Sequence, residues 1–271
     1  MASDVLLIDD PAPKVRRFTL NRPEKRNALN DALRGALFDA LRAGDKDKDV
    51  SVMIIRGAGP CFSAGYDLGS ANSDVERAIS RADGWWSRHV VNNWFEMWDM
   101  TTPIIGQVHG YCLAGGTELA TACDLVYVAH DAKIGYPPVR LMSPPDMQWQ
   151  TWMIGLRRGM EALLTGDSMS GDDAVAYGFA NRAFDLADLD REVLAMAERV
   201  AKIPPDLLAL NKRAAHRAME VMGIRAGIRA TAEIQALGFH QRSSMEYMQS
   251  FATKGVTAAL SERDAQFSDY R

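Results

Sequence analysis

One glycine-rich turn organises this sequence: Gly110-Tyr111-Cys112-Leu113-Ala114-Gly115-Gly116-Thr117-Glu118. The apolar run before it, Ile104–Val108, has the pattern of a buried strand, and Glu118–Ala122 has the pattern of a starting helix. The need for positive φ angles is enough to explain glycines in such a turn. Because the turn also opens a helix, its backbone N–H groups and the positive end of the helix dipole point to one place.

A second turn has the same setting. Phe62-Ser63-Ala64-Gly65-Tyr66-Asp67-Leu68 follows the apolar run Val52–Ile55. Taken singly, each turn is more simply interpreted as tight backbone geometry. Together they indicate chemistry, because glycine lets backbone N–H groups face a cleft. A pair of such donors forms an oxyanion hole, which stabilises the negative charge that develops on a carbonyl oxygen.

Strand and helix patterns alternate over the first part of the chain, with further strands expected at Val5–Ile8, Val15–Leu20 and Leu125–Ala129. This alternation implies parallel strands joined by crossover helices, and hence an α/β fold. The remainder is helical in pattern, over Leu189–Lys202, Leu207–Met222 and Arg229–Phe251. We therefore expect an α/β core over residues 1–185 and a helical region over residues 186–271 that packs on a neighbouring copy.

Composition excludes several classes of protein. The 271 residues are 47% apolar and carry a net charge of −4, which gives no sign of a nucleic-acid-binding surface. No run approaches the roughly 18 apolar residues of a membrane-spanning helix. The Gly57–Phe62 turn lacks the third glycine of a dinucleotide-binding loop. Cysteines and histidines without metal-ligand spacing, and an acidic N-terminus, favour a cytoplasmic protein without a metal.

Four blocks of sequence occur together and in order: Leu20–Leu29, Phe62–Leu68, Pro103–Asp124 and Ser170–Phe184. In these blocks the chain resembles the crotonase superfamily, the enoyl-CoA hydratase/isomerase proteins. The resemblance covers most of the chain and is weakest over residues 74–100 and the C-terminal helices. It implies an α/β crotonase fold of repeated ββα units with a C-terminal helical trimerisation region. It also implies a homotrimer, or a hexamer that is a dimer of trimers.

The resemblance further implies a site for an acyl-CoA thioester. The oxyanion hole of the family falls on the backbone N–H groups of Tyr66 and Gly115, which would hold the thioester carbonyl and stabilise an enolate. Because this role belongs to the backbone, changes to the Tyr66 side chain are expected to matter far less than changes to Glu118. The CoA-binding positions fall on Arg22, Lys25, Arg26 and Ala64, and the three basic side chains are expected near the phosphates.

Three positions decide what the enolate does next. Hydratases of the family use two glutamates around a water molecule, and Glu118 falls on the first; the alternative is an exposed acid at a helix start. The second falls on Pro138, which carries no proton, so the two-glutamate scheme is broken. Eight residues on, Asp146 matches the position of a base in the dienoyl-CoA isomerase branch. The alternative is a cap on a helix beginning near Gln148.

Four tryptophans lie in residues 74–100, a region with a helical pattern where the family forms its acyl pocket. Their spacing places them on one helix face. Core packing is expected to explain at least two of them, and the others would line a pocket for a bulky or alicyclic acyl group. They are Trp85, Trp86, Trp94 and Trp98.

These features together predict an enzyme of the enoyl-CoA hydratase/isomerase type that hydrates or isomerises a double bond without a cofactor. Two alternatives stay open. The same enolate chemistry permits hydrolytic or retro-Claisen cleavage of a cyclic ketone or a ketoacyl-CoA. The second alternative is a protein that binds acyl-CoA without turnover, for which Pro138 is the strongest argument.

Overall fold

A six-stranded sheet forms the centre of the computed structural model, which describes residues 5–69 and 85–270, without the side chains of residues 85–88. The strands lie in the order β1-β2-β3-β4-β6-β8; β1 and β2 pair antiparallel and all later pairs are parallel. Strands β5 and β7 form a separate parallel pair. The bounds are β1 Leu6–Ala12, β2 Val15–Leu20, β3 Val52–Gly57, β4 Ile104–Val108, β5 Tyr111–Leu113, β6 Leu125–Ala129, β7 Lys133–Gly135 and β8 Arg182–Phe184.

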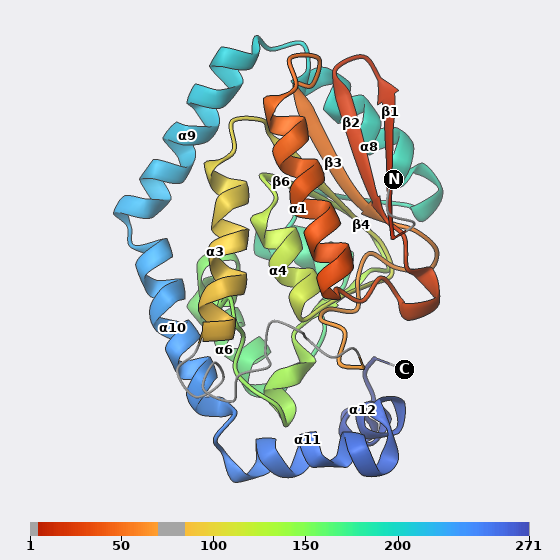
Figure 1. The fold of residues 1–271 in the computed structure, drawn as a ribbon, viewed down its shortest axis with the longest axis vertical. Helices are drawn as coiled ribbons and strands as arrows, with labels where there is room; N and C mark the ends of the chain where they lie inside the picture. The colour runs from red at the N-terminus through yellow and green to blue at the C-terminus, as the bar shows by residue number, and fades with distance from the viewer. Residues whose placement is uncertain (1–4, 70–84, 271) are drawn as a thin grey trace.

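Helices cover both faces of the sheet, as Figure 1 shows. Three of them, α1 (Asp31–Lys46), α3 (Trp85–Asp99) and α4 (Gly115–Ala122), lie in front of the strands in that view. On the opposite face, α8 (Leu186–Val200) contacts β1, β3, β4, β6 and β8. All residues of β4 are buried, as expected for a parallel strand covered on both sides. The α/β layers therefore include α8.

Shorter helical segments connect these layers: η1 (Pro23–Lys25), η3 (Pro137–Arg140), α5 (Gln150–Met153), α6 (Gly155–Thr165) and α7 (Gly171–Tyr177). The helix predicted within residues 74–100 is observed over α3, and residues 74–84 lie outside the described part of the chain. None of the helices in the described ranges combines the length and the hydropathy needed to cross a membrane.

The C-terminal helices wrap the edge of the molecule. Helix α9 (Pro205–Val221) leads into α10 (Ile224–Gly238), which packs against α3, and α11 (Arg242–Lys254) and α12 (Val256–Ala265) follow at one end (Figure 1). The single helical stretch predicted over Arg229–Phe251 is therefore two helices. The break falls after Gly238, where the backbone lies so close to Pro144 that an added Cβ would be 2.8 Å from it.

Candidate active site

The two glycine-rich turns lie against each other. The N–H of Leu113 donates to the carbonyl of Ser63 at 2.9 Å. A Cβ at Gly116 would lie 2.6 Å from that same carbonyl oxygen, and one at Gly65 would lie 2.8 Å from the Cβ of Ala114. Backbones this close leave no room for a side chain, which explains both glycines. The parallel strands β3 and β4 thus bring together two segments that are remote in sequence.

The N-terminus of α4 presents backbone donors beside the Gly65–Tyr66 turn. Gly115 is the first residue of α4, and the first N–H groups of a helix have no acceptor within the helix. The residue before it, Ala114, has φ 49° and ψ −121°, a strained conformation of a kind that clusters at functional sites. An added Cβ at Gly115 would lie 2.8–3.0 Å from three ring atoms of Tyr66. The structure therefore places Tyr66 and Gly115, the two predicted oxyanion-hole residues, next to each other.

Glu118 is fully buried in the first turn of α4, with a relative exposure of 0%. Its Oε2 accepts hydrogen bonds from the Tyr66 hydroxyl at 2.5 Å and from Trp94 Nε1 at 3.1 Å. Its Oε1 accepts one from the Met147 backbone N–H at 3.2 Å. The alternative of an exposed acid at the start of a helix is therefore wrong. The Tyr66 side chain contacts this carboxylate directly, and whether its replacement matters less for activity than replacement of Glu118 stays a prediction.

Burial raises the pKa of the Glu118 carboxyl, and the hydrogen bond from Tyr66 is the largest effect in the opposite direction. Removing a carboxylate from water disfavours its charged form, whereas donors pointing at it favour that form. The further opposing bonds come from Met147, Trp94 and Tyr136. A carboxyl with a raised pKa among fixed donors is suited to taking up and releasing a proton at moderate pH.

Asp146 lies in the same buried cluster, with a relative exposure of 4%. Its Oδ2 accepts a hydrogen bond from the Tyr136 hydroxyl at 3.4 Å. The pKa values of Tyr66 and Tyr136 are raised, first by burial and then by the charges of both Glu118 and Asp146. The helix expected near Gln148 is the single turn α5, whose N-cap residue forms no side-chain cap bond. That N-cap residue is Trp149, so Asp146 does not occupy the N-cap position of α5.

Pro138 shapes the loop that carries Asp146. It lies in η3, and its carbonyl oxygen accepts the N–H groups of three successive residues, Leu141, Met142 and Ser143, at 3.3, 2.8 and 3.1 Å. This tight turn reverses the chain after Tyr136, so that Asp146 returns to hydrogen-bond distance of the same tyrosine. The turn at Pro138 thus brings the Asp146 carboxylate back beside Tyr136.

Hydrogen bonds anchor the predicted CoA loop, which contains Arg22, Lys25 and Arg26, to the segment that leads into the Gly65–Tyr66 turn. Asn27 is fully buried, and its Nδ2 donates to the carbonyls of Ala58 and Cys61, both at 2.8 Å. The N–H of Ala64 donates to the carbonyl of Arg26 at 2.9 Å, which joins the loop directly to the residue before Gly65. A ligand on this loop would thus have a fixed position relative to the Gly65–Tyr66 turn.

The three basic side chains of this loop have different settings. Arg22 donates to Asp67 Oδ2 at 2.9 Å and also to the carbonyl of Ala28, so its guanidinium holds the loop to the turn. Lys25 and Arg26 are exposed, and the Arg26 guanidinium lies 5.4 Å from the centre of the Tyr111 ring. The exposed charged side chains of the loop are Glu24, Lys25 and Arg26, which together leave one net positive charge.

The four predicted pocket tryptophans differ in where the structure places them. Trp94 is 1% exposed and reaches the site through its bond to Glu118. Trp98 is buried elsewhere, stacked on His216 at 5.4 Å between ring centres. The side chains of Trp85 and Trp86 lie outside the described residues, although both residues belong to α3.

Two further side chains complete the site. Tyr136 was not predicted, although it stands beside the Pro137-Pro138 pair that marked the departure from the family. Arg34 of α1 is 5% exposed, and its charge opposes the rise that burial causes in the pKa of Tyr66. Neither has a sequence signal, because the contacts that bring Arg34 and Tyr136 to Tyr66, Glu118 and Asp146 join segments remote in sequence.

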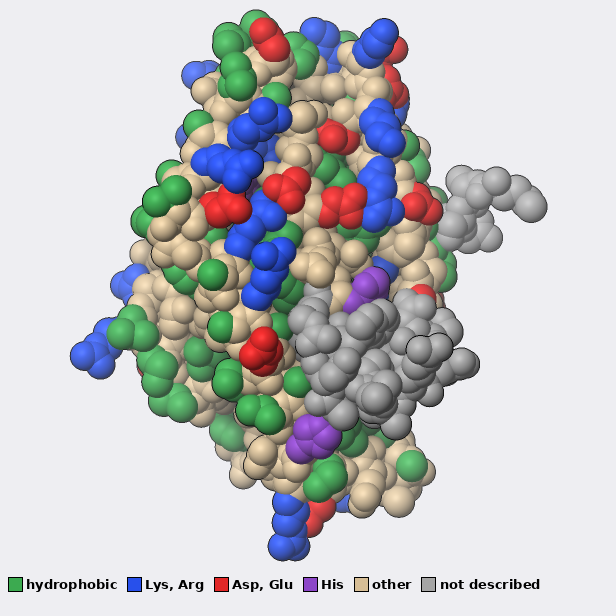
Figure 2. Space-filling model, turned by 60° about the vertical axis from the view of Figure 1, so that its left-hand side comes forward, with side chains coloured by type: hydrophobic (Ala, Val, Ile, Leu, Met, Phe, Trp, Pro, Cys, Tyr) green, Lys and Arg blue, Asp and Glu red, His purple; other side chains and the backbone are tan. Residues whose placement is uncertain are grey.

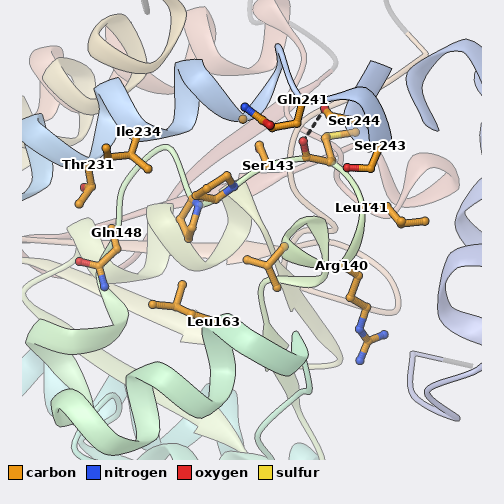
Figure 3. A pocket seen from close by; sticks show the side chains of 15 residues that line it. Arg140, Leu141, Ser143, Gln148, Leu163, Thr231, Ile234, Gln241, Ser243 and Ser244 are labelled. Carbon is orange, nitrogen blue, oxygen red and sulfur yellow. Dashed lines mark hydrogen bonds between the residues drawn. The ribbon is translucent and has the colours of Figure 1, made fainter. Parts of the chain in front are cut away.

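A separate cavity of about 390 Å³ borders the loop that carries Asp146 (Figure 3). Its walls come from residues 139–145, from α6 and from the α10–α11 corner, with Gln148, Leu163 and Ile234 pointing toward it. Neither Glu118 nor Asp146 lines this cavity, so it is distinct from the carboxylate cluster.

Comparison with known proteins identifies the family of the chain. Residues 12–267 match the family model described as enoyl-CoA hydratase/isomerase. The chain is 30% identical over 244 residues to a probable mitochondrial enoyl-CoA hydratase of Dictyostelium discoideum, covering 89% of this chain and 86% of that protein.

Two solved structures show the same fold. An enoyl-CoA hydratase from Mycobacterium smegmatis superposes with a TM-score of 0.91 at 29% identity, covering 98% of this chain and 95% of that one. An enoyl-CoA hydratase/isomerase from Xanthobacter autotrophicus gives 0.86 at 31% identity, with 98% and 99% covered. The chain therefore belongs to the enoyl-CoA hydratase/isomerase family. Its mixed α/β fold with C-terminal helices is that of the crotonase-fold enoyl-CoA hydratases.

Proposed function

We propose that the protein is an acyl-CoA enzyme that isomerises a carbon–carbon double bond, with Glu118 and Asp146 as its two proton carriers. The observation that carries this proposal is the burial of both carboxylates in one cluster beside the N-terminus of α4. Their shared partners, Tyr66 and Tyr136, link the two groups electrostatically. Pairs of interacting titratable groups are the usual mark of acid–base assignments.

The reaction would begin with the thioester oxygen at the N–H groups of Tyr66 and Gly115. One carboxylate, Glu118, removes a proton from the acyl chain, and the electron pair moves into the conjugated system and onto the thioester oxygen. The two donors stabilise this oxyanion. Asp146, protonated at the start of the cycle, then delivers its proton to a different carbon while the electron pair returns from the oxygen, which completes the shift of the double bond. Proton exchange with solvent afterwards removes the proton from Glu118 and restores the one on Asp146. Oxyanion stabilisation by backbone donors requires no metal or redox group, so we propose a reaction without a cofactor.

Hydration is the second candidate, and the same pair of buried carboxylates favours it. One carboxylate would deprotonate a water molecule that attacks the β-carbon, and the other would protonate the α-carbon. The relatives named above as hydratases make this a reaction to test. The absence of a proton-carrying side chain at residue 138 leaves Asp146 as the second group.

The exposed positive charges of Lys25 and Arg26 support a position for the CoA moiety at their loop. Lys25 and Arg26 would lie near its phosphates, with Ala64 beside the pantetheine arm, while Arg22 maintains the loop through Asp67. This arrangement directs a thioester from the loop toward the Gly65–Tyr66 turn.

Exposed apolar side chains support assembly as a homotrimer or a hexamer. Val221 and Leu237, at the ends of α9 and α10, are 89% and 58% exposed, and Leu164 of α6 is 76% exposed. Figure 2 brings the α9–α10 side forward, and hydrophobic side chains gather along its left-hand edge. Burial of such surfaces between copies is the main favourable contribution to association. The buried free cysteines are consistent with a cytoplasmic location, which we also propose.

The test is incubation with separate enoyl-, dienoyl- and ketoacyl-CoA thioesters, followed by mass spectrometry and ultraviolet spectroscopy. Isomerisation predicts unchanged mass with a changed conjugation spectrum, and hydration predicts the added mass of one water. Cleavage of a ketoacyl-CoA would instead favour the hydrolytic alternative. Binding without change of any thioester would contradict the enzyme assignment.

A further inference from the structure

Tyr66 makes contact with the site through both its backbone and its side chain. Its backbone N–H is one of the two proposed oxyanion donors. Its hydroxyl donates to Glu118 Oε2 at 2.5 Å, the shortest of the three bonds to that carboxylate described above. The ring lies over Gly115, where an added Cβ would come within 2.8–3.0 Å of it, so the absence of a side chain there makes room for the ring.

The hydrogen bonds to Glu118 are distributed unequally between its two carboxylate oxygens. Oε2 accepts from both Tyr66 and Trp94, which uses its two lone-pair positions. Oε1 accepts from the Met147 N–H, and the Tyr136 hydroxyl also lies close enough to the carboxylate to oppose the rise in its pKa. Rotation of the carboxylate would break the bond from Tyr66, the contact with the shortest distance.

We propose that the Tyr66 hydroxyl is a positioning group, which holds the Glu118 carboxylate in one orientation for proton exchange with the acyl chain. This inference rests on the function proposed above. A locked carboxylate stands ready beside the oxyanion donors, and holding a reacting group in one geometry is a large part of enzymatic rate enhancement. One residue thereby couples the place where the thioester binds to the orientation of the base.

The electrostatic setting suits this role. Burial raises the pKa of Tyr66 well above its usual value, so the phenol stays protonated and remains a donor. Its donation favours the charged form of Glu118 against the effect of burial. The groups that face this pair come from four elements and loops: Arg34 of α1, Trp94 of α3, Tyr136 after β7, and Asp146 with Met147 N–H in the following loop.

The test uses Tyr66→Phe, which keeps the backbone donor and the ring and removes only the hydroxyl. We expect kcat to fall about 10- to 100-fold, the range for a hydrogen bond to a charged group, with KM for the acyl-CoA within about twofold. The limb of the pH–rate profile that belongs to Glu118 should move to higher pH, because the variant lacks a donor to the carboxylate. Tyr127→Phe, on β6 and outside the site, is the matched control and should leave all three values unchanged.

A second measurement needs no substrate. Infrared titration of protein with isotope-labelled glutamate, with the Glu118→Gln spectrum subtracted, reports ionisation of Glu118 alone. The pKa of Glu118 should be higher in Tyr66→Phe than in the wild type. An unchanged pKa together with wild-type kcat would overturn the inference. If Glu118→Gln is inactive while Tyr66→Phe is normal, only this inference fails. If Glu118→Gln is fully active, the proposed function fails with it.

Discussion

Replacing Glu118 with glutamine tests the acid–base role with little change of shape. The amide supplies one acceptor atom, whereas the carboxylate accepts from Tyr66 and Trp94 at Oε2 and from the Met147 N–H at Oε1. The best fit keeps the amide oxygen at the Oε2 position, where it accepts from Tyr66 and Trp94. The amide nitrogen then faces the Met147 N–H, so one buried donor loses its acceptor, at a cost of about 1–3 kcal/mol.

The activity change should be larger than this structural effect. An amide at this position takes up no proton, so we expect kcat to fall about 10²- to 10⁴-fold, the usual range for one acid–base group. Binding of a non-reactive acyl-CoA analogue, measured by calorimetry, should be close to wild type. Steady-state kinetics on the best substrate from the thioester panel measures this change in kcat.

Stability against pH gives an independent check. Burial raises the pKa of Glu118 in the folded protein, so its ionisation disfavours folding. The advantage of wild type over Glu118→Gln is therefore complete below the unfolded pKa of 4.5 and declines as pH rises through the higher folded value. The decline amounts to about 1.4 kcal/mol for each unit between the two pKa values. Wild-type turnover in the glutamine variant, or a stability difference that does not vary with pH in urea titrations, would refute this reasoning.

Two further predictions follow from the loop and from the turn. Lys25→Glu with Arg26→Glu should weaken CoA binding and reduce its dependence on salt, because attraction between opposite charges is screened by ions; unchanged calorimetric affinity would contradict this placement. Gly115→Ala should displace the Tyr66 ring, lower stability by about 1–3 kcal/mol and reduce kcat at least as much as Tyr66→Phe. Gly35→Ala in α1, where an added Cβ meets nothing within 4 Å, should be neutral or slightly stabilising in the same melts.

Local patterns predicted the framework of this fold and site. The apolar runs before the two glycine-rich turns are β3 and β4, and the turn at Gly110–Glu118 opens α4 as expected. Strand pattern and turn chemistry are properties of neighbouring residues, so one sequence contains them. The resemblance to the family supplied Asp146, which no local pattern distinguishes from a capping residue.

Contacts between remote segments were not predictable. Tyr66 and Glu118 are 52 residues apart, and no spacing rule pairs a phenol with a carboxylate at that distance. The close approach of Gly238 to Pro144 joins two remote segments, and the helical pattern of Arg229–Phe251 contains no sign of it. Arg22 has the same charge as Lys25 in the sequence, and only the structure shows its bond to Asp67.

Deuterium exchange at individual carbons tests the central claim, that Glu118 and Asp146 carry protons to different carbons of one acyl chain. The enzyme is incubated in heavy water with the acyl-CoA substrate, and nuclear magnetic resonance locates the deuterium. Wild type should exchange at two carbons and form the isomer. Asp146→Asn should bind the thioester normally and exchange only at the carbon served by Glu118, without forming the isomer. Isomerisation by Asp146→Asn at the wild-type rate, or exchange at both carbons in that variant, would contradict the account.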